Sequence, residues 1–136
     1  MSYGISGALQ AAIFERLSND ALVSSLIGSD IYDAVPTGVI PETYVSLGRE
    51  RVEDASDQTG NGALHRFDIS VITTQPGFTA AKQLAGAISD TLSDANLSLS
   101  RGRLVYLRFD RAEARRVDAN AGREVLLRFR ARVEDE

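Results

Sequence analysis

Apolar and polar residues alternate most regularly over residues 123–134 (REVLLRFRARVE). A period of two is typical of a strand with one buried face and one open face. Shorter alternations predict strands over residues 64–74 and 103–111, the second with Val105, Leu107 and Phe109 on a common face. In the last strand the side chains expected to point inward are Val125, Leu127, Phe129, Ala131 and Val133.

Helical periodicity occurs in three other stretches of the chain. Apolar residues recur near the 3.6-residue period over residues 6–18, over a short stretch at 21–27, and again over 79–92. Ser6, Asp20 and Thr79 stand at the starts of these stretches and are predicted N-caps, and Gly28 is predicted to end the second helix. The buried stripe of the third helix is predicted to contain Ala81, Leu84, Ala85, Ile88 and Leu92.

The remaining segments complete the order of elements. Residues 31–35 and 43–47 are short and apolar and predict extended chain, whereas residues 49–63 are mostly polar and predict an exposed arm or loop. A polar turn is expected at 118–122. The resulting order, α-α-β-β-β-α-β-β, predicts an α+β fold: a single domain over residues 1–136, with a mostly antiparallel sheet and two main helices packed on one face.

Composition narrows the class of protein. The 136 residues are 43% hydrophobic and 25% charged and include no cysteine, which is ordinary for a globular domain and excludes thiol chemistry and disulfides. We expect no signal peptide, because the first basic residue is Arg16. No apolar run approaches the roughly 20 residues that cross a bilayer, so we expect no membrane partner.

Candidate catalytic and metal-binding residues are few. His65 is the single histidine, and a general base needs a positioned partner and usually a nucleophile. Glu50, Glu53, Asp54 and Asp57 form the densest carboxylate cluster, but the interleaved Arg49 and Arg51 favour ion pairing or solvation over metal binding. We therefore expect no catalytic residue, no metal site and no cofactor.

Charge is segregated along the chain. The net charge is -4, but residues 1–64 carry three basic against nine acidic groups, whereas residues 101–132 carry ten arginines against four acidic groups. Such polarity can guide the stacking of copies or layers. A solvated charged surface explains it equally well.

The arginine run of the last strand is the strongest functional candidate. Arg128, Arg130 and Arg132, with Arg108 on the preceding strand, are expected on one outer sheet face, where like charges repel unless something opposes them. The opposing group can be an acidic subunit face, a phosphate backbone, or water and counterions.

The whole layout resembles a known family. It opens with a helix containing Leu9-Gln10-Ala11-Ala12-Ile13, followed by Leu26-Ile27-Gly28, Ile31-Tyr32-Asp33 and Pro36. Pro41 and Tyr44-Val45-Ser46-Leu47-Gly48, then His65 opening a strand and a closing arginine-rich strand, complete it. This pattern resembles the tail terminator, or tail-completion, family of long-tailed phages, prophages and gene transfer agents.

The resemblance implies a structural role in a virion or phage-like particle assembled in the bacterial cytoplasm. A homo-oligomeric ring, expected to be hexameric, is expected to cap the head-proximal end of the tail tube, stop tube polymerisation and join a head-completion or neck protein. DNA is expected to pass through its lumen without sequence-specific binding. The alternatives are a head-tail connector ring and a small nucleic-acid-binding protein. The candidate residues for a contact with another subunit or the tube are Arg49, Glu50, Arg51, Glu53, Asp54, Asp57, Arg108, Arg128, Arg130 and Arg132.

Overall fold

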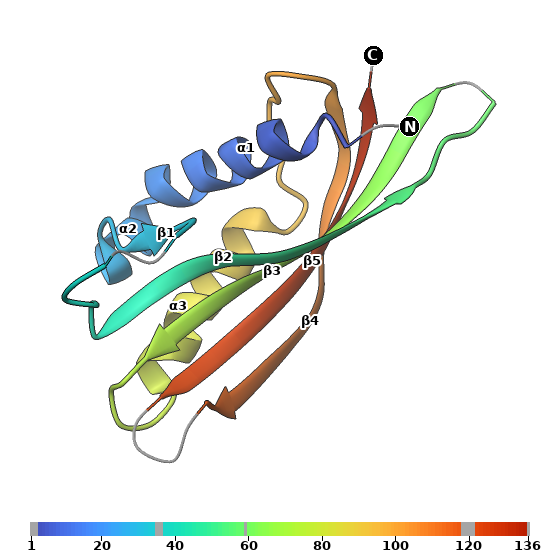
Figure 1. Cartoon of the computed structure of the whole chain (residues 1–136). Helices are drawn as coiled ribbons and strands as arrows, with labels where there is room; N and C mark the ends of the chain where they lie inside the picture. The colour runs from blue at the N-terminus through green and yellow to red at the C-terminus, as the bar shows by residue number, and fades with distance from the viewer. Residues whose placement is uncertain (1–2, 35–36, 59, 118–121, 136) are drawn as a thin grey trace.

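The computed structural model describes residues 3–34, 37–58, 60–117 and 122–135. Along these residues the elements follow the order that the sequence predicts, two helices, three strands, a helix and two strands, which confirms the α+β class (Figure 1). Residues 118–121 of the expected polar turn, together with Pro36, lie outside the described residues. The elements are α1 (Ser6–Asn19), α2 (Ala21–Ile27), β1 (Ile31–Tyr32), β2 (Thr43–Asp54), β3 (Asn61–Thr73), α3 (Thr79–Leu92), β4 (Arg103–Arg116) and β5 (Arg123–Asp135).

The strands form one sheet in the order β1-β2-β3-β5-β4. The two-residue strand β1 pairs parallel to β2, and every other pairing is antiparallel. All three helices lie on the same side of this sheet (Figure 1). We call the opposite side, which the helices leave uncovered, the open face. The predicted two-layer arrangement is therefore confirmed.

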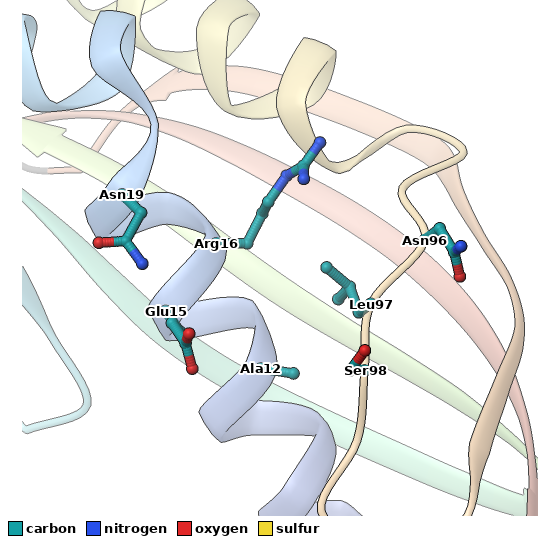
Figure 2. A pocket seen from close by; sticks show the side chains of 7 residues that line it. All are labelled: Ala12, Glu15, Arg16, Asn19, Asn96, Leu97 and Ser98. Carbon is teal, nitrogen blue, oxygen red and sulfur yellow. The ribbon is translucent and has the colours of Figure 1, made fainter.

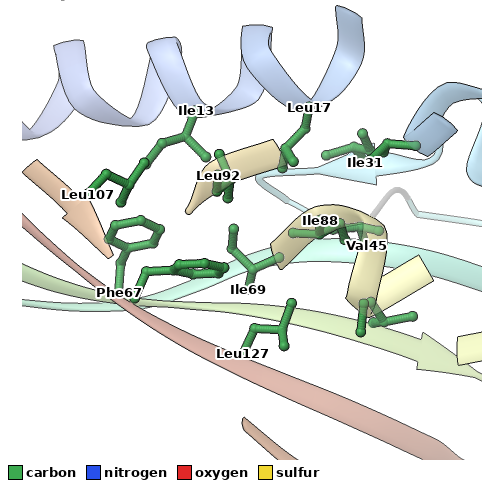
Figure 3. Close-up of a cluster of buried hydrophobic side chains, with 14 of the residues drawn as sticks. Ile13, Leu17, Ile31, Val45, Phe67, Ile69, Ile88, Leu92, Leu107 and Leu127 are labelled. Atoms are coloured by element: carbon green, nitrogen blue, oxygen red, sulfur yellow. The ribbon is translucent and has the colours of Figure 1, made fainter. Parts of the chain in front are cut away.

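The core fills the space between the helices and the covered face of the sheet (Figure 3). The period-two prediction for β5 is confirmed, because its five alternating apolar side chains are all buried. The apolar stripe predicted for α3 is buried as well. From α1 the core receives Leu9, Ile13 and Leu17.

Two predicted helix caps differ from the structure. The N-cap positions of α1 and α3 belong to Ile5 and Phe78, and neither helix has a side-chain cap bond. Ser6 and Thr79 are the first residues inside their helices, so each N-cap lies one residue earlier than the sequence predicts. Asp20 does cap α2, since its carboxylate accepts a hydrogen bond of 3.0 Å from the Val23 amide.

The facing of β4 also differs from the prediction. The pairing of β4 with β5 shifts between Leu104 and Tyr106 and again between Phe109 and Arg111. A shift of one residue turns the following side chains to the other face. Leu104 therefore packs against the core, and Val105 is exposed.

The segment 49–63 is largely paired strand. β2 continues to Asp54 and β3 begins at Asn61, so most of the polar segment forms the distal part of a β2–β3 hairpin. This part projects away from the helices at one end of the sheet (Figure 1). Polar residues fit there because the distal part of β2 has one face in water and little apolar cover on the other.

Candidate functional site

Four arginines lie side by side across the open face. Arg51 of β2 is opposite Arg66 of β3, Arg66 is opposite Arg130 of β5, and Arg130 is opposite Arg108 of β4. Directly opposed residues in adjacent strands have side chains on the same face of the sheet. We call these four residues the cross-strand arginine row. It extends the predicted arginine run from two strands to four.

Further arginines flank this row. Arg128 lies opposite Arg111 on the neighbouring pair of positions, and Arg132 lies opposite Tyr106. A hollow of about 460 Å³ opens on the β2–β3–β5 part of the face. Its lining consists of four arginines and two carboxylates: Arg49, Arg51, Arg66, Arg128, Glu50 and Asp68.

Part of this positive charge is balanced within the chain. Arg128 donates to both carboxylate oxygens of Asp68, at 2.9 and 3.4 Å, and Asp68 is buried. The hydrogen bonds and charge of Asp68 raise the pKa of the Arg128 guanidinium. Arg130 donates to Asp110 at 3.0 Å. Arg132 donates to the Ala55 carbonyl at 2.7 Å.

Other guanidinium groups on the same face form no ion pair within the described part of the chain. Among the residues that the structure describes, no ion pair within 4.0 Å involves Arg49, Arg66, Arg108 or Arg111. Arg108 lies over the Tyr106 ring, with its guanidinium carbon 4.2 Å from the ring centroid. That stacking holds the side chain against the sheet without neutralising it. We call Arg49, Arg66, Arg108 and Arg111 the free arginines.

The basic and acidic residues are less separated in the folded chain than they are along the sequence. Arg101 pairs with Asp135 at 2.7 Å, and Arg115 pairs with Glu124 at 3.0 Å. Both pairs lie inside the C-terminal third, so many of its arginines already have carboxylates beside them. Excess positive charge is concentrated on the middle of the open face instead.

Glu50 lines the edge of the hollow on the open face, but its carboxylate is bonded on the helix side of the sheet. The β2–β3 register shifts between Leu47 and Glu50, which turns the Glu50 side chain toward the helices. There its carboxylate accepts hydrogen bonds from Tyr3 at 2.5 Å and Ser6 at 2.6 Å, and contacts His65 at 3.1 Å. Burial raises the pKa of the Glu50 carboxyl, but the bonds from Ser6, Tyr3 and His65 outweigh it and hold that pKa below its usual range. Glu50 thus fastens the start of α1 to the sheet.

The remaining acidic candidates lie at the distal end of the hairpin. Arg51 pairs with Glu53 at 3.2 Å. Asp54 accepts hydrogen bonds from the Ser56 hydroxyl and amide, which lower the pKa of the Asp54 carboxyl. Asp57 accepts from the Gly60 amide at 3.0 Å. These carboxylates stabilise the turn, and within the described residues no three His, Asp or Glu side chains are grouped as a metal site would need.

A second hollow lies beside α1. Figure 2 shows a pocket of about 300 Å³ between α1 and the segment 96–98. Its one arginine, Arg16, is occupied, because its Nε donates to the Thr91 carbonyl at 3.2 Å and the Thr91 hydroxyl at 3.1 Å. His65 does not line that pocket; it is fully buried, and its Nδ1 lies 3.1 Å from a carboxylate oxygen of Glu50. None of the described helices combines the length and apolarity that crossing a bilayer requires.

Most of the large apolar side chains that are exposed lie in two groups, apart from Tyr3 and Phe14. One group lies on α2 and the loop before β2, where Val39 is 95% exposed. The other lies along β4, where Val105 and Phe109 are each 41% exposed. Large exposed apolar side chains at a sheet edge favour a contact with another protein surface. The first group comprises Leu22, Leu26, Val39 and Ile40, and the second comprises Val105, Phe109 and the following Val117.

Sequence reasoning found the arginines of β5 but missed Arg66 and Arg111 as members of the same surface. The sequence did indicate that Arg66 faces outward, since it precedes the buried Phe67 on a predicted strand. Its alignment with Arg51, Arg130 and Arg108 depends on strand register, which a single sequence does not supply.

Comparisons with known proteins agree with this picture. Over residues 11–134 the chain matches the family described as tail completion protein gp17. It is similar to a solved chain from a structure described as the virion of a native gene transfer agent (GTA) particle, with 57% identity and a TM-score of 0.93. That match covers 98% of this chain and 99% of the other. Curated proteins gave no match. The resemblance drawn from the sequence is thereby confirmed, and the chain belongs to the tail completion protein gp17 family.

Proposed function

We propose that this chain is a tail terminator, a structural subunit whose ring caps the head-proximal end of a phage-like tail tube. Its family is that of a tail completion protein, and the similar chain comes from a GTA virion, so we place the protein in such a particle. The ring stops tube polymerisation and presents a surface to a head-completion or neck protein. Six subunits are the expected number.

The two unlike edges of the sheet are the observation that carries the ring proposal. β4 is a 14-residue edge strand. On the opposite side β1 pairs only with Val45 and Ser46, so no described strand pairs with the outer edge of β2 from Leu47 onward. Unpaired strand edges are prone to bind another chain. A ring built head to tail needs two different complementary surfaces on each subunit, and these edges, each with its exposed apolar group, provide them.

The distal hairpin supplies a second contact in the proposal. Its tip presents Arg51, Glu53, Asp54 and Asp57 beside Arg132, a mixture of both charges. A projecting hairpin with mixed charge suits a polar contact at the rim of an interface. We assign it to the neighbouring subunit or to the tail tube protein.

Solution mass tests the ring. Light scattering over a range of concentration and salt, with negative-stain imaging of the same sample, is expected to give closed rings of a single size, alone or after tail tubes are added. Val39→Ser is expected to raise the concentration needed for ring formation roughly tenfold, because burying one valine contributes about 1.5 kcal/mol. Val39→Leu is the matched control and keeps ring formation.

Two outcomes contradict the proposal. A protein that stays monomeric at every concentration and is not recruited to tube ends is not a terminator. Labelled protein found on the head side of the neck, rather than at the last ring of the tail, identifies a connector ring instead.

A further inference from the structure

We propose that the open face of the sheet binds the phosphate backbone of double-stranded DNA, without sequence preference, through the four free arginines. The proposal goes beyond ring formation and rests on the proposed function in one respect: a ring at the tail end gives DNA as the polyanion that passes the subunit. The binding surface itself is defined by the chain's own residues.

The arginines of the open face are regularly spaced across the sheet. The cross-strand arginine row has one member on each of four neighbouring strands, and strands lie about 4.8 Å apart. The row therefore crosses roughly 14 Å of the open face. Duplex DNA presents phosphates continuously along its surface, and a guanidinium fork can bind a phosphate through two hydrogen bonds. Within this row the two free arginines, Arg66 and Arg108, lie two strands, or about 10 Å, apart, so each can meet a phosphate of the same duplex.

The aligned arginines of the row repel one another in the isolated chain. Like charges placed directly opposite each other on adjacent strands are destabilising, and Arg66 faces an arginine on both sides. Asp68 and Asp110 neutralise Arg128 and Arg130. Arg66 and Arg108 have no such partner among the described residues. A sheet that keeps them aligned leaves their charge available to an external anion.

The sheet of a second copy of the chain does not offer the arginines a matching acidic surface, whereas DNA does. No pairing in the described sheet places two carboxylates opposite each other. A neighbouring subunit's sheet thus has no acidic row to match the arginines. Nucleic-acid bases are not the target either, because Phe67 and Phe129 lie on the covered face and Tyr106 is already stacked under Arg108.

The structure also decides which arginines to change. Arg128 is bonded to the buried Asp68, so reversing its charge would disturb folding as well as any contact. Arg66→Gln with Arg108→Gln removes two free guanidinium groups and breaks no described ion pair. Lys82→Gln with Arg116→Gln removes the same charge from α3 and from the end of β4, also breaks no ion pair among the described residues, and serves as the control.

The experiment measures the affinity of the full chain for a short fluorescent DNA duplex of two unrelated sequences, between about 50 and 200 mM salt. We expect both sequences to bind alike and affinity to fall steeply with salt. Each lost phosphate contact lowers the slope of log affinity against log salt by about 0.9. The Arg66/Arg108 variant should therefore lose about 1.8 from that slope, and the control should keep the wild-type slope.

Each other outcome overturns the proposal. Equal losses in the two variants mean that net charge alone attracts DNA. An unchanged affinity in the Arg66/Arg108 variant, combined with lost binding to purified tail tubes, makes the open face a protein interface. The same samples are weighed by light scattering, so a failure to form rings is recorded separately from a failure to bind DNA.

Discussion

Three phenylalanines on the covered face form a row directly beside the arginines. Phe67, Phe129 and Phe109 are opposite one another on β3, β5 and β4, and each is the chain neighbour of an arginine of the cross-strand row. The Phe129 ring lies 5.6 Å from that of Phe67 at 20°, and 6.0 Å from that of Phe109 at 77°. Phe129 thus makes two ring contacts, and Phe109 makes one.

The number of ring contacts sets the loss of unfolding free energy that we expect when each of these two phenylalanines is replaced. An aromatic contact of this kind contributes about 0.5–1.5 kcal/mol beyond the burial of area. Phe129→Leu should therefore lower the free energy of unfolding by roughly 1–3 kcal/mol. Phe109→Leu should lower it by about half as much, since one contact is lost and a side chain that is 41% exposed leaves no enclosed cavity.

Urea unfolding followed by circular dichroism measures both losses. The two variants and the wild type are compared at one protein concentration and one oligomeric state, because assembly itself adds stability. The slope of the free energy against urea should stay constant while the midpoint falls. Equal losses in the two variants, or a loss below about 0.5 kcal/mol for Phe129→Leu, would refute the reasoning that the ring contacts hold these strands in register.

Three further predictions concern single positions. The pKa of the Glu50 carboxyl in the folded state lies below its ordinary 4.5. The charged carboxylate therefore stabilises the fold above pH 4.5, and this stabilisation is lost as the pH falls through the folded-state pKa. The difference in melting temperature between the wild type and Glu50→Gln should accordingly shrink from about pH 6 toward acid. Asp20→Ala should lower the free energy of unfolding by about 1 kcal/mol, whereas Thr79→Ala, which removes no cap, should change it by less than about 0.5 kcal/mol; a larger loss at Thr79 would contradict the observed cap positions. Gly102→Ala should destabilise the protein, because the φ of Gly102 is +70° and an added Cβ would lie 2.6 Å from the Glu134 carbonyl oxygen. Gly86→Ala in α3, where an added Cβ would meet no atom within 4 Å, should instead stabilise the protein by about 0.5–1 kcal/mol. Thermal unfolding of the two variants should show a lower melting temperature for the first and a higher one for the second.

Much of the fold was predictable because its periodic signals are local. The alternation on β5 and the stripe on α3 reflect burial of every second or every third to fourth side chain, and both patterns are visible in the sequence. The places that differed are β-bulges and helix starts. A bulge depends on where one strand gains a residue relative to its partner, as between Leu104 and Tyr106, and the partner is remote in sequence.

The candidate site was predictable only in part for the same reason. The outward position of Arg128, Arg130 and Arg132 follows from alternation within β5 alone. Whether each of these arginines has an ion-pair partner does not follow from alternation. Arg128 is bonded because Asp68 lies beside it on β3, 60 positions away in the chain, and no carboxylate of the described residues pairs with Arg66 in this way. Glu50 shows the converse, since a residue surrounded by polar neighbours in sequence was turned inward by a single register shift.

That shift at Gly48 and Arg49 acts on β2 much as an inserted base acts on a reading frame. Before it, odd-numbered residues such as Val45 and Leu47 face the core; after it, even-numbered residues such as Glu50 do. Two residues of β2 stand there opposite the single Asp68 of β3, so removing one of them would restore regular pairing and keep Glu50 inward and Arg51 outward. We therefore expect a one-residue deletion at this point to be tolerated better than a one-residue deletion after Glu50, which would exchange the two faces over the rest of the strand.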